Sequence, residues 1–150
     1  MRKAHQVLAI VLGALVVVQA MAIAYAIAGL DHYISKDHGT VTKAVLDSWD
    51  KHPPSWRGFG GFELHGINGT ALIPLVTIVF FVVSLLTKDV PGASQRASIL
   101  FGMVALQVVL GLGIEDVVVL APLHALNGFG IFAMAIVTAR KAGESPAVAA

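Results

Sequence analysis

The sequence predicts an all-α membrane protein in which four transmembrane helices form an up-down bundle. Three observations predict this fold class. Hydrophobic residues make up 57% of the 150 residues, and the mean hydropathy of +0.81 lies far above that of ordinary soluble domains. These residues gather in stretches long enough to cross a bilayer core, for which about 20 residues are needed. A short motif also occurs twice, at the start of two of these stretches.

The composition excludes several classes of function. Only 13% of the residues are charged and the net charge is +1, so the chain offers neither a basic surface for nucleic acid nor an acidic tail. The absence of cysteine from the sequence excludes disulfides, thiolate metal sites, iron–sulfur clusters and cysteine nucleophiles. Any metal or cofactor would have to be held by His, Met, Tyr or carboxylate side chains.

Each predicted span is free of Lys and Arg and is followed by a helix-breaking or charged segment. Val90-Pro91-Gly92-Ala93 is a turn signal after the second span. Pro122 suits the first turn of the fourth span, which Arg140 and Lys141 end. The predicted spans are residues 7–30, 62–87, 97–113 and 122–138.

The first stretch also resembles a secretory signal peptide, because Met-Arg-Lys precedes an apolar run with Ala-x-Ala sites. We interpret it as a retained span, since residues 7–30 are long for the apolar region of such a peptide. Residues 1–150 are therefore expected to form a single four-helix transmembrane domain.

Basic residues set the predicted orientation. Six of them flank the spans on one side and four on the other, and the side that carries more is the cytoplasmic one. This predicts a multi-pass protein of the bacterial cytoplasmic membrane with both termini in the cytoplasm. The six are Arg2, Lys3, Lys88, Arg96, Arg140 and Lys141, and the four are Lys36, Lys43, Lys51 and Arg57.

The outer loop between the first two spans, residues 31–61, is the longest polar segment. Apolar residues recur there at helical spacing, which predicts a short amphipathic helix in the membrane interface that ends at His52-Pro53-Pro54. The aromatic residues that follow are expected to form an interfacial belt. The helix face consists of Val41, Ala44, Val45 and Trp49, and the belt of Trp56, Phe59 and Phe62.

The motif that occurs twice opens the second and fourth spans. Leu64-His65-Gly66-Ile67-Asn68-Gly69 matches Leu123-His124-Ala125-Leu126-Asn127-Gly128, so both copies read Leu-His-small-aliphatic-Asn-Gly. A glutamine, Gln19 or Gln107, lies in the middle of the span before each copy, and we expect it to hydrogen-bond across helices. The sequence therefore predicts two duplicated helical hairpins related by a pseudo-two-fold axis along the membrane normal.

This symmetry would place His65 and His124 at the same depth, facing each other. The second and fourth helices of an up-down bundle are diagonal neighbours with axes roughly 13–14 Å apart, which leaves room for one metal ion between two imidazoles. Haem iron takes only two axial ligands from the protein, so two such histidines would complete a haem without any further protein donor. One turn further along each helix lie an Asn that could fix polar groups and a Gly that would leave room for a flat macrocycle. These are Asn68 and Gly69 in the first copy and Asn127 and Gly128 in the second. The expected cofactor site also includes Glu63, Gln19 and Gln107.

Two other interpretations of the motif stay open. Asn and Gly could simply pack and hydrogen-bond the helices against one another. Zinc or copper could bind instead of haem if Glu63 supplied a further ligand. The remaining histidines are all expected to be solvated: His5, His32, His38 and His52.

Around these histidines the chain resembles haem A synthase, whose two four-helix halves each present an opposed His pair. The second hairpin carries Gln107-Val108-Val109-Leu110-Gly111 and then Pro122-Leu123-His124, similar to that family's Gln-x-x-Leu-Gly followed by Pro and a helix-opening His. In the first hairpin Glu63 lies two residues before His65, whereas the family places its acid three residues before its His and usually follows the His with Arg. The resemblance implies a haem-b-binding bundle equivalent to one half of the enzyme. The chain is also similar to small bacterial four-helix membrane proteins of unassigned function.

These observations predict a b-type cytochrome that passes single electrons between a membrane donor, such as a quinol or another respiratory-chain partner, and an acceptor at the outer face. One histidine pair is fewer than the synthase uses, so a single chain is not expected to be a self-sufficient enzyme. Two alternatives stay open: a non-catalytic accessory or assembly subunit without a cofactor, and a haem-modifying enzyme that acts as a homodimer of halves.

Overall fold

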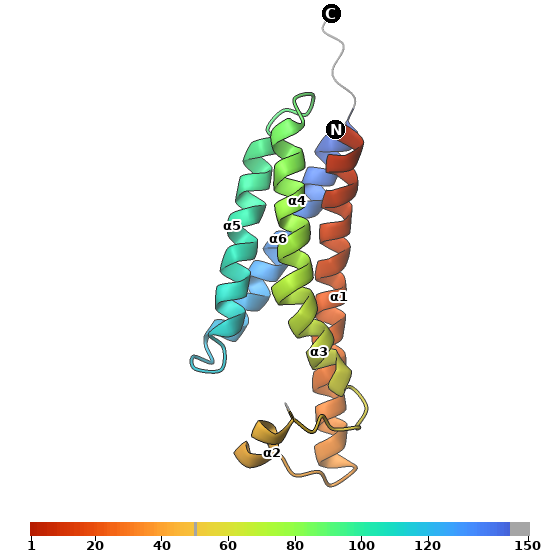
Figure 1. Ribbon diagram of the computed structural model, residues 1–150, viewed down its shortest axis with the longest axis vertical. Coiled ribbons are helices and arrows are strands. Elements are labelled where there is room, and N and C mark those ends of the chain that lie inside the picture. Colours follow the sequence, from red (N-terminus) through yellow and green to blue (C-terminus); the bar gives the residue numbers. More distant parts are fainter. Residues whose placement is uncertain (50, 145–150) are drawn as a thin grey trace, which may run out of the picture. The chain divides into compact units, whose positions relative to one another are not determined.

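The computed structural model describes residues 1–49 and 51–144, and every regular element in that part of the chain is a helix (Figure 1). Within it, four helical runs are long and apolar enough to cross a membrane, which confirms the predicted all-helical, multi-pass class. The elements are α1 (Arg2–Ser35), α2 (Lys43–Ser48), α3 (Phe59–Ile67), the π-helical turn η1 (Asn68–Leu72), α4 (Ile73–Leu86), α5 (Ala93–Leu112) and α6 (Leu120–Gly143).

All four helical runs begin before their predicted spans, and α1 and α6 also end after theirs. α1 begins at Arg2 and ends at Ser35, whereas the apolar stretch in the sequence predicted a span of residues 7–30. At about 1.5 Å per residue, a helix of 34 residues is longer than the roughly 30 Å of hydrocarbon that it has to cross. Hydropathy marks only the part that lipid can cover, while the polar ends continue because each further residue adds a backbone hydrogen bond.

The second span is not one uniform α-helix. α3 leads into η1, and α4 begins directly after η1 with Pro74 in its first turn. Proline has no amide hydrogen, and in a regular helix its ring collides with the carbonyl group four residues earlier. That residue is Thr70, inside η1, so the wider π turn lies where a regular α-helix would meet this conflict.

The chain forms two compact units, each of which has its own packing. The four-helix unit contains Met1–Val17 and the chain from Gly69 onward, and the hairpin unit contains Val18–Asn68. α1 therefore contributes its first half to the four-helix unit and its second half to the hairpin unit.

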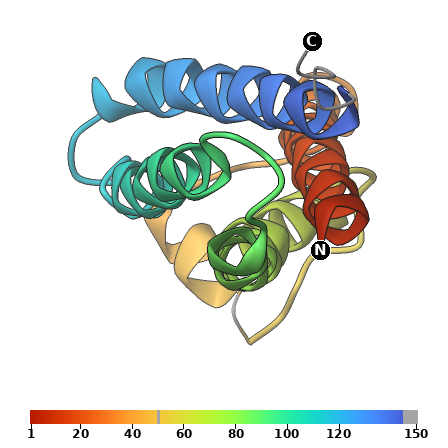
Figure 2. The ribbon, with the colours of Figure 1, turned by 90° about the horizontal axis from the view of Figure 1, so that it is seen from above.

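The four-helix unit packs the first half of α1 with α4, α5 and α6 around an apolar core (Figure 2). Its largest fully buried apolar side chains are Leu12, Phe80, Leu100 and Ile131. The outward faces carry large apolar residues that are about half exposed, such as Leu75 at 59%. Lipid tails are as apolar as such side chains, so this surface is suited to a membrane. The unit thus has the form of a transmembrane helical bundle.

One end of the four-helix unit carries all six basic residues that predicted the orientation. Arg2 Nε donates to the carbonyl oxygen of Ala142 at 2.6 Å, and Val90 and Ala93, at the α4–α5 turn, are buried together with Ala142. The start of α1, the α4–α5 turn and the end of α6 therefore share one end, the upper one in Figure 1. We call it the basic end, after Arg2, Lys3, Lys88, Arg96, Arg140 and Lys141.

The hairpin unit contains the second half of α1, the short helix α2, and α3. α2 lies within the segment where the sequence predicted a short helix, but it ends at Ser48, before the predicted end at His52-Pro53-Pro54. Thr42 caps its first turn, because its hydroxyl oxygen accepts from the amide of Val45 at 3.3 Å. The aromatic residues pack on one another: the ring of Trp56 is stacked on that of Tyr33, with centroids 5.6 Å apart. The whole ring cluster consists of Tyr33, Trp49, Trp56, Phe59 and Phe62.

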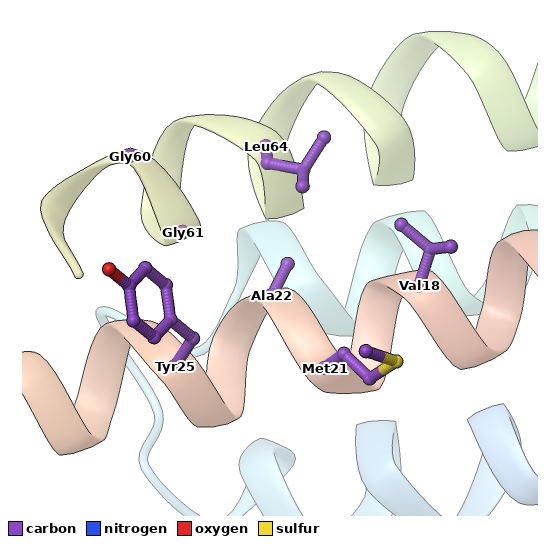
Figure 3. Close-up of a pocket in the computed structure, with 7 residues that line it drawn as sticks. All are labelled: Val18, Met21, Ala22, Tyr25, Gly60, Gly61 and Leu64. Carbon is purple, nitrogen blue, oxygen red and sulfur yellow. The ribbon is translucent and has the colours of Figure 1, made fainter.

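Glycines let α1 and α3 approach each other closely within the hairpin unit. A Cβ atom on Gly61 would lie 2.5 Å from the carbonyl oxygen of Ala22, whereas one on Gly60 would meet no atom within 4 Å. Gly58, just before α3, has a φ of 98°, a conformation that favours glycine. Figure 3 shows the groove between the two helices, which is lined by Val18, Met21, Ala22, Tyr25, Gly60, Gly61 and Leu64.

Replacing Gly61 with Ala should destabilise the hairpin unit, because the new methyl group would have to push α3 away from a backbone atom of α1. We expect the free energy of unfolding to fall by about 1–3 kcal/mol. The matched control is Gly60→Ala, which fills open space and replaces a flexible helical glycine, so it should be neutral or stabilise by up to about 1 kcal/mol. Thermal unfolding of both variants in one detergent measures the difference, and equal midpoints would contradict the close packing at Gly61.

Candidate functional site

In the hairpin unit, the first copy of the motif forms a hydrogen-bonded cluster with Gln19. Nδ1 of His65, on α3, lies 3.1 Å from the backbone carbonyl oxygen of Gln19, on α1. The side chain of Gln19 donates from Nε2 to the carbonyl oxygen of His65 at 2.7 Å. Its Oε1 accepts from Nδ2 of Asn68, which is almost fully buried, at 2.8 Å. One glutamine thus contacts both polar residues of the motif.

In the four-helix unit, the second copy of the motif forms the corresponding cluster with Gln107. Nδ1 of His124, on α6, lies 3.1 Å from the backbone carbonyl oxygen of Gln107, on α5. Nδ2 of Asn127 donates to Oε1 of Gln107 at 2.7 Å and to the carbonyl oxygen of Met103 at 2.9 Å. The prediction that both glutamines hydrogen-bond across helices is therefore confirmed.

The hydrogen bond at Nδ1 decides where the proton of each histidine ring lies. A carbonyl oxygen can only accept, so Nδ1 is the donor in both clusters. In the neutral imidazole the lone pair then lies on the other ring nitrogen, Nε2. Histidines that bind a metal almost always donate the remaining ring N–H to a carbonyl, carboxylate or water, which fixes the ring and raises its basicity. His65 and His124 therefore share the same tautomer, with the proton on Nδ1 and the lone pair on Nε2.

Glycines beside the second cluster set how closely α5 and α6 approach each other. A Cβ atom on Gly111 would lie 3.0 Å from Cε1 of His124, and one on Gly128 would lie 3.3 Å from Nε2 of Gln107. The sequence left two roles open for Gly128, namely room for a flat macrocycle and close packing of helices. Its short approach to Gln107 corresponds to helix packing. Gly69, its counterpart in the first copy, lies in η1 and is half-buried.

Glu63 is exposed and does not join the first cluster. It precedes His65 by two residues on α3, which turns the two side chains about 200° apart around a helix. Within residues 1–49 and 51–144, no three His, Asp or Glu side chains form a group that could hold a metal ion, whereas zinc needs about three protein ligands even at an open site.

Two contributors to the second cluster were not among the predicted site residues. Met103 acts through its backbone carbonyl oxygen, so its side-chain type gives no signal in the sequence. Gly111 follows Gln107 by one helical turn and lies against the His124 ring. Its place in the motif that resembles haem A synthase was a signal that could have identified it.

No protein-family model matches the chain, and no curated protein or solved structure is significantly similar to it. The resemblance to haem A synthase therefore stays a prediction that rests on short motifs. What the chain can do follows from the chemistry of its two clusters, in which a glutamine on one membrane-spanning helix orients a histidine on the next.

Proposed function

We propose that this chain is a membrane protein that binds haem b with His65 and His124 as axial ligands and transfers single electrons. The observation that carries the proposal is the Nδ1–H bond that each ring donates to the backbone carbonyl oxygen of a glutamine. Two neutral imidazoles whose Nε2 lone pairs are fixed in direction are the protein ligands that low-spin haem requires. When bound, haem b supplies reversible one-electron chemistry.

The chain's own residues orient the proposed ligands. The carbonyl groups of Gln19 and Gln107 prevent the rings from turning, and as acceptors they make each imidazole a better electron donor to a metal. The side-chain amides of the same glutamines hold Asn68 and Asn127 in place. The electron donor in this proposal is a quinol or another respiratory-chain partner, and the acceptor lies outside the membrane.

We further propose that the chain is a duplicated hairpin. In its support, the two hydrogen bonds that define each cluster have matching lengths: 3.1 and 3.1 Å for histidine to glutamine carbonyl, and 2.8 and 2.7 Å for asparagine to glutamine side chain. The chain between the two helices differs, since α2 and its loop separate α1 from α3 while a short link joins α5 to α6. In this proposal α2 and the ring cluster are an addition to the first hairpin that lies in the membrane interface.

We propose that the basic end faces the cytoplasm of a bacterial inner membrane, which makes both termini cytoplasmic. The support is the gathering of the six basic residues at one end of the four-helix unit. Because the sequence lacks cysteine, single introduced cysteines report on each side. In intact cells, Ser48→Cys in α2 should react with an impermeant maleimide and Ser94→Cys at the basic end should not. The reverse labelling pattern would show that the orientation is wrong.

The function is tested by the visible absorption spectrum of the full chain, expressed with ample haem and purified in detergent. The reduced protein should show the sharp bands of low-spin haem b with two histidine ligands. A folded preparation that is colourless and free of metal would refute haem binding.

A second candidate function is a non-catalytic accessory or assembly subunit without a cofactor. The clusters themselves favour it, because interhelical hydrogen bonds stabilise membrane proteins by about 0.6–2 kcal/mol each and Gly128 packs against Gln107. A colourless, folded preparation would support this candidate. A haem-modifying enzyme, which would require a homodimer of halves, is distinguished by mass spectrometry of the haem extracted after incubation with oxygen and a reductant.

A further inference from the structure

His5 lies at the basic end and belongs to neither cluster. The sequence predicted that it would be solvated at the cytoplasmic edge, and this prediction is wrong because the residue is 0% exposed. Its ring is covered by α4, where the centroid of the Phe80 ring lies 4.9 Å away. The same prediction is confirmed for the three histidines that are exposed, His32, His38 and His52.

Two consecutive hydrogen bonds fix the proton on the His5 ring. Oγ of Ser84 lies 2.6 Å from the carbonyl oxygen of Phe80, which can only accept, so the serine hydroxyl is the donor there. Nδ1 of His5 lies 2.8 Å from the same Oγ and must therefore donate to it. The other ring nitrogen, Nε2, is buried and has no hydrogen-bond partner among the residues that the structure describes. This environment suits the neutral ring, because a second N–H would lack an acceptor.

The groups around His5 give a second proton no compensating acceptor. The charged groups that act on the ring are Arg96, on α5, and Asp89, in the α4–α5 turn. The guanidinium opposes a positive charge on the ring and the carboxylate favours one. Thr138, on α6, is uncharged and buried, and its hydroxyl also lacks a partner in the described chain.

We propose that His5 is a proton-binding site at the basic end, whose neutral form holds α1 against α4 and whose protonated form releases that contact. The hydrogen bond to Ser84 and the ring contact with Phe80 both join α1 to α4, and both are lost if the ring turns to carry a new N–H to water. The bonds from α1 to α6, which start from Arg2 and Gln6, involve no group that titrates near neutral pH. The release therefore concerns the α4 side of α1, and it does not depend on haem.

The sign of the effect on stability follows from which state binds the proton. In the unfolded chain an ordinary imidazole takes up a proton below about pH 6.5, whereas the folded site excludes it. The unfolded state therefore binds more protons in acid, and stability rises with pH through this range. For each pH unit below about 6.5, the titration of His5 should lower the equilibrium constant for folding by up to tenfold.

The test compares thermal unfolding of the full chain in detergent at about pH 7.5 and about pH 5 with that of His5→Asn. The asparagine amide can still donate to Ser84 but does not titrate. The variant should therefore lose less stability in acid than the wild type, and the difference in the equilibrium constant for folding should reach up to tenfold per pH unit. The matched control is His52→Asn, at an exposed position, which should keep the wild-type dependence on pH. Because wild type and His5→Asn share all the other histidines, an equal loss in these two chains would overturn the proposal.

Amide hydrogen exchange of the wild type provides the second measurement, which decides the question if His5→Asn does not fold. After correction for the intrinsic effect of pH, the amides of residues 2–12 should exchange faster at about pH 5 than at about pH 7.5, while those of α5 should not change. Equal corrected rates at both pH values in residues 2–12 would overturn the proposal.

Discussion

Replacing either His65 or His124 with Ala is expected to abolish the low-spin spectrum of the reduced protein, with the two variants behaving alike. Each substitution removes one of the two proposed axial ligands and leaves the other histidine and its Nδ1–H bond intact. Loss of an outer partner of a metal ligand typically costs about 10–100-fold in affinity, so loss of the ligand itself should cost more. The measurements are the visible spectrum of the reduced protein and the haem content per chain.

The control for this pair is His52→Ala, which removes an exposed imidazole and should leave the spectrum unchanged. Free imidazole added to His65→Ala or His124→Ala should restore part of the low-spin bands, because it can enter the space that the ring vacates. If one variant loses the low-spin spectrum and the other keeps it, the two histidines are not a ligand pair. If both keep it, the haem is bound elsewhere and the proposed site is wrong.

The sequence predicted the number of membrane-spanning helices because lipid imposes a simple rule, namely about 20 apolar residues for each crossing. It did not predict their ends, since the polar turns at either end of α1 are held by backbone hydrogen bonds that hydropathy does not register. The π turn before Pro74 was also missed. The proline marks a conflict with a regular helix, but how the backbone resolves it depends on the packing of neighbouring helices.

The partners within each cluster were predictable because the duplicated motif drew attention to a glutamine, a histidine and an asparagine together. The atoms that make the contacts were not, because the backbone carbonyl groups that accept from His65 and His124 leave no trace in residue type. His5 shows the opposite error. Its place at the cytoplasmic edge suggested solvent, yet burial of one helical turn is decided by residues far along the chain, here Phe80 and Ser84.

Replacing Gly111 with Leu should damage the second cluster while leaving the first intact. Even the Cβ atom would lie 3.0 Å from Cε1 and 3.3 Å from Nδ1 of His124, so the bulk of a leucine must move the ring away from its acceptor on Gln107. We expect haem affinity to fall by about 10–100-fold, as for other changes that disturb the orientation of a metal ligand. Haem titration of the variant and the wild type measures this loss.

The matched control is Gly102→Leu on the same helix, where a Cβ atom meets nothing within 4 Å and the larger side chain can extend into lipid. Both variants exchange glycine for leucine within α5, so any gain in helix propensity, about 1 kcal/mol, is common to them. A readout that does not require haem is the nitrogen NMR of the imidazoles: Gly111→Leu should lose the Nδ1–H signal of His124 and keep that of His65. If both signals persist and haem affinity is unchanged, the contact of Gly111 with the ring does not position His124.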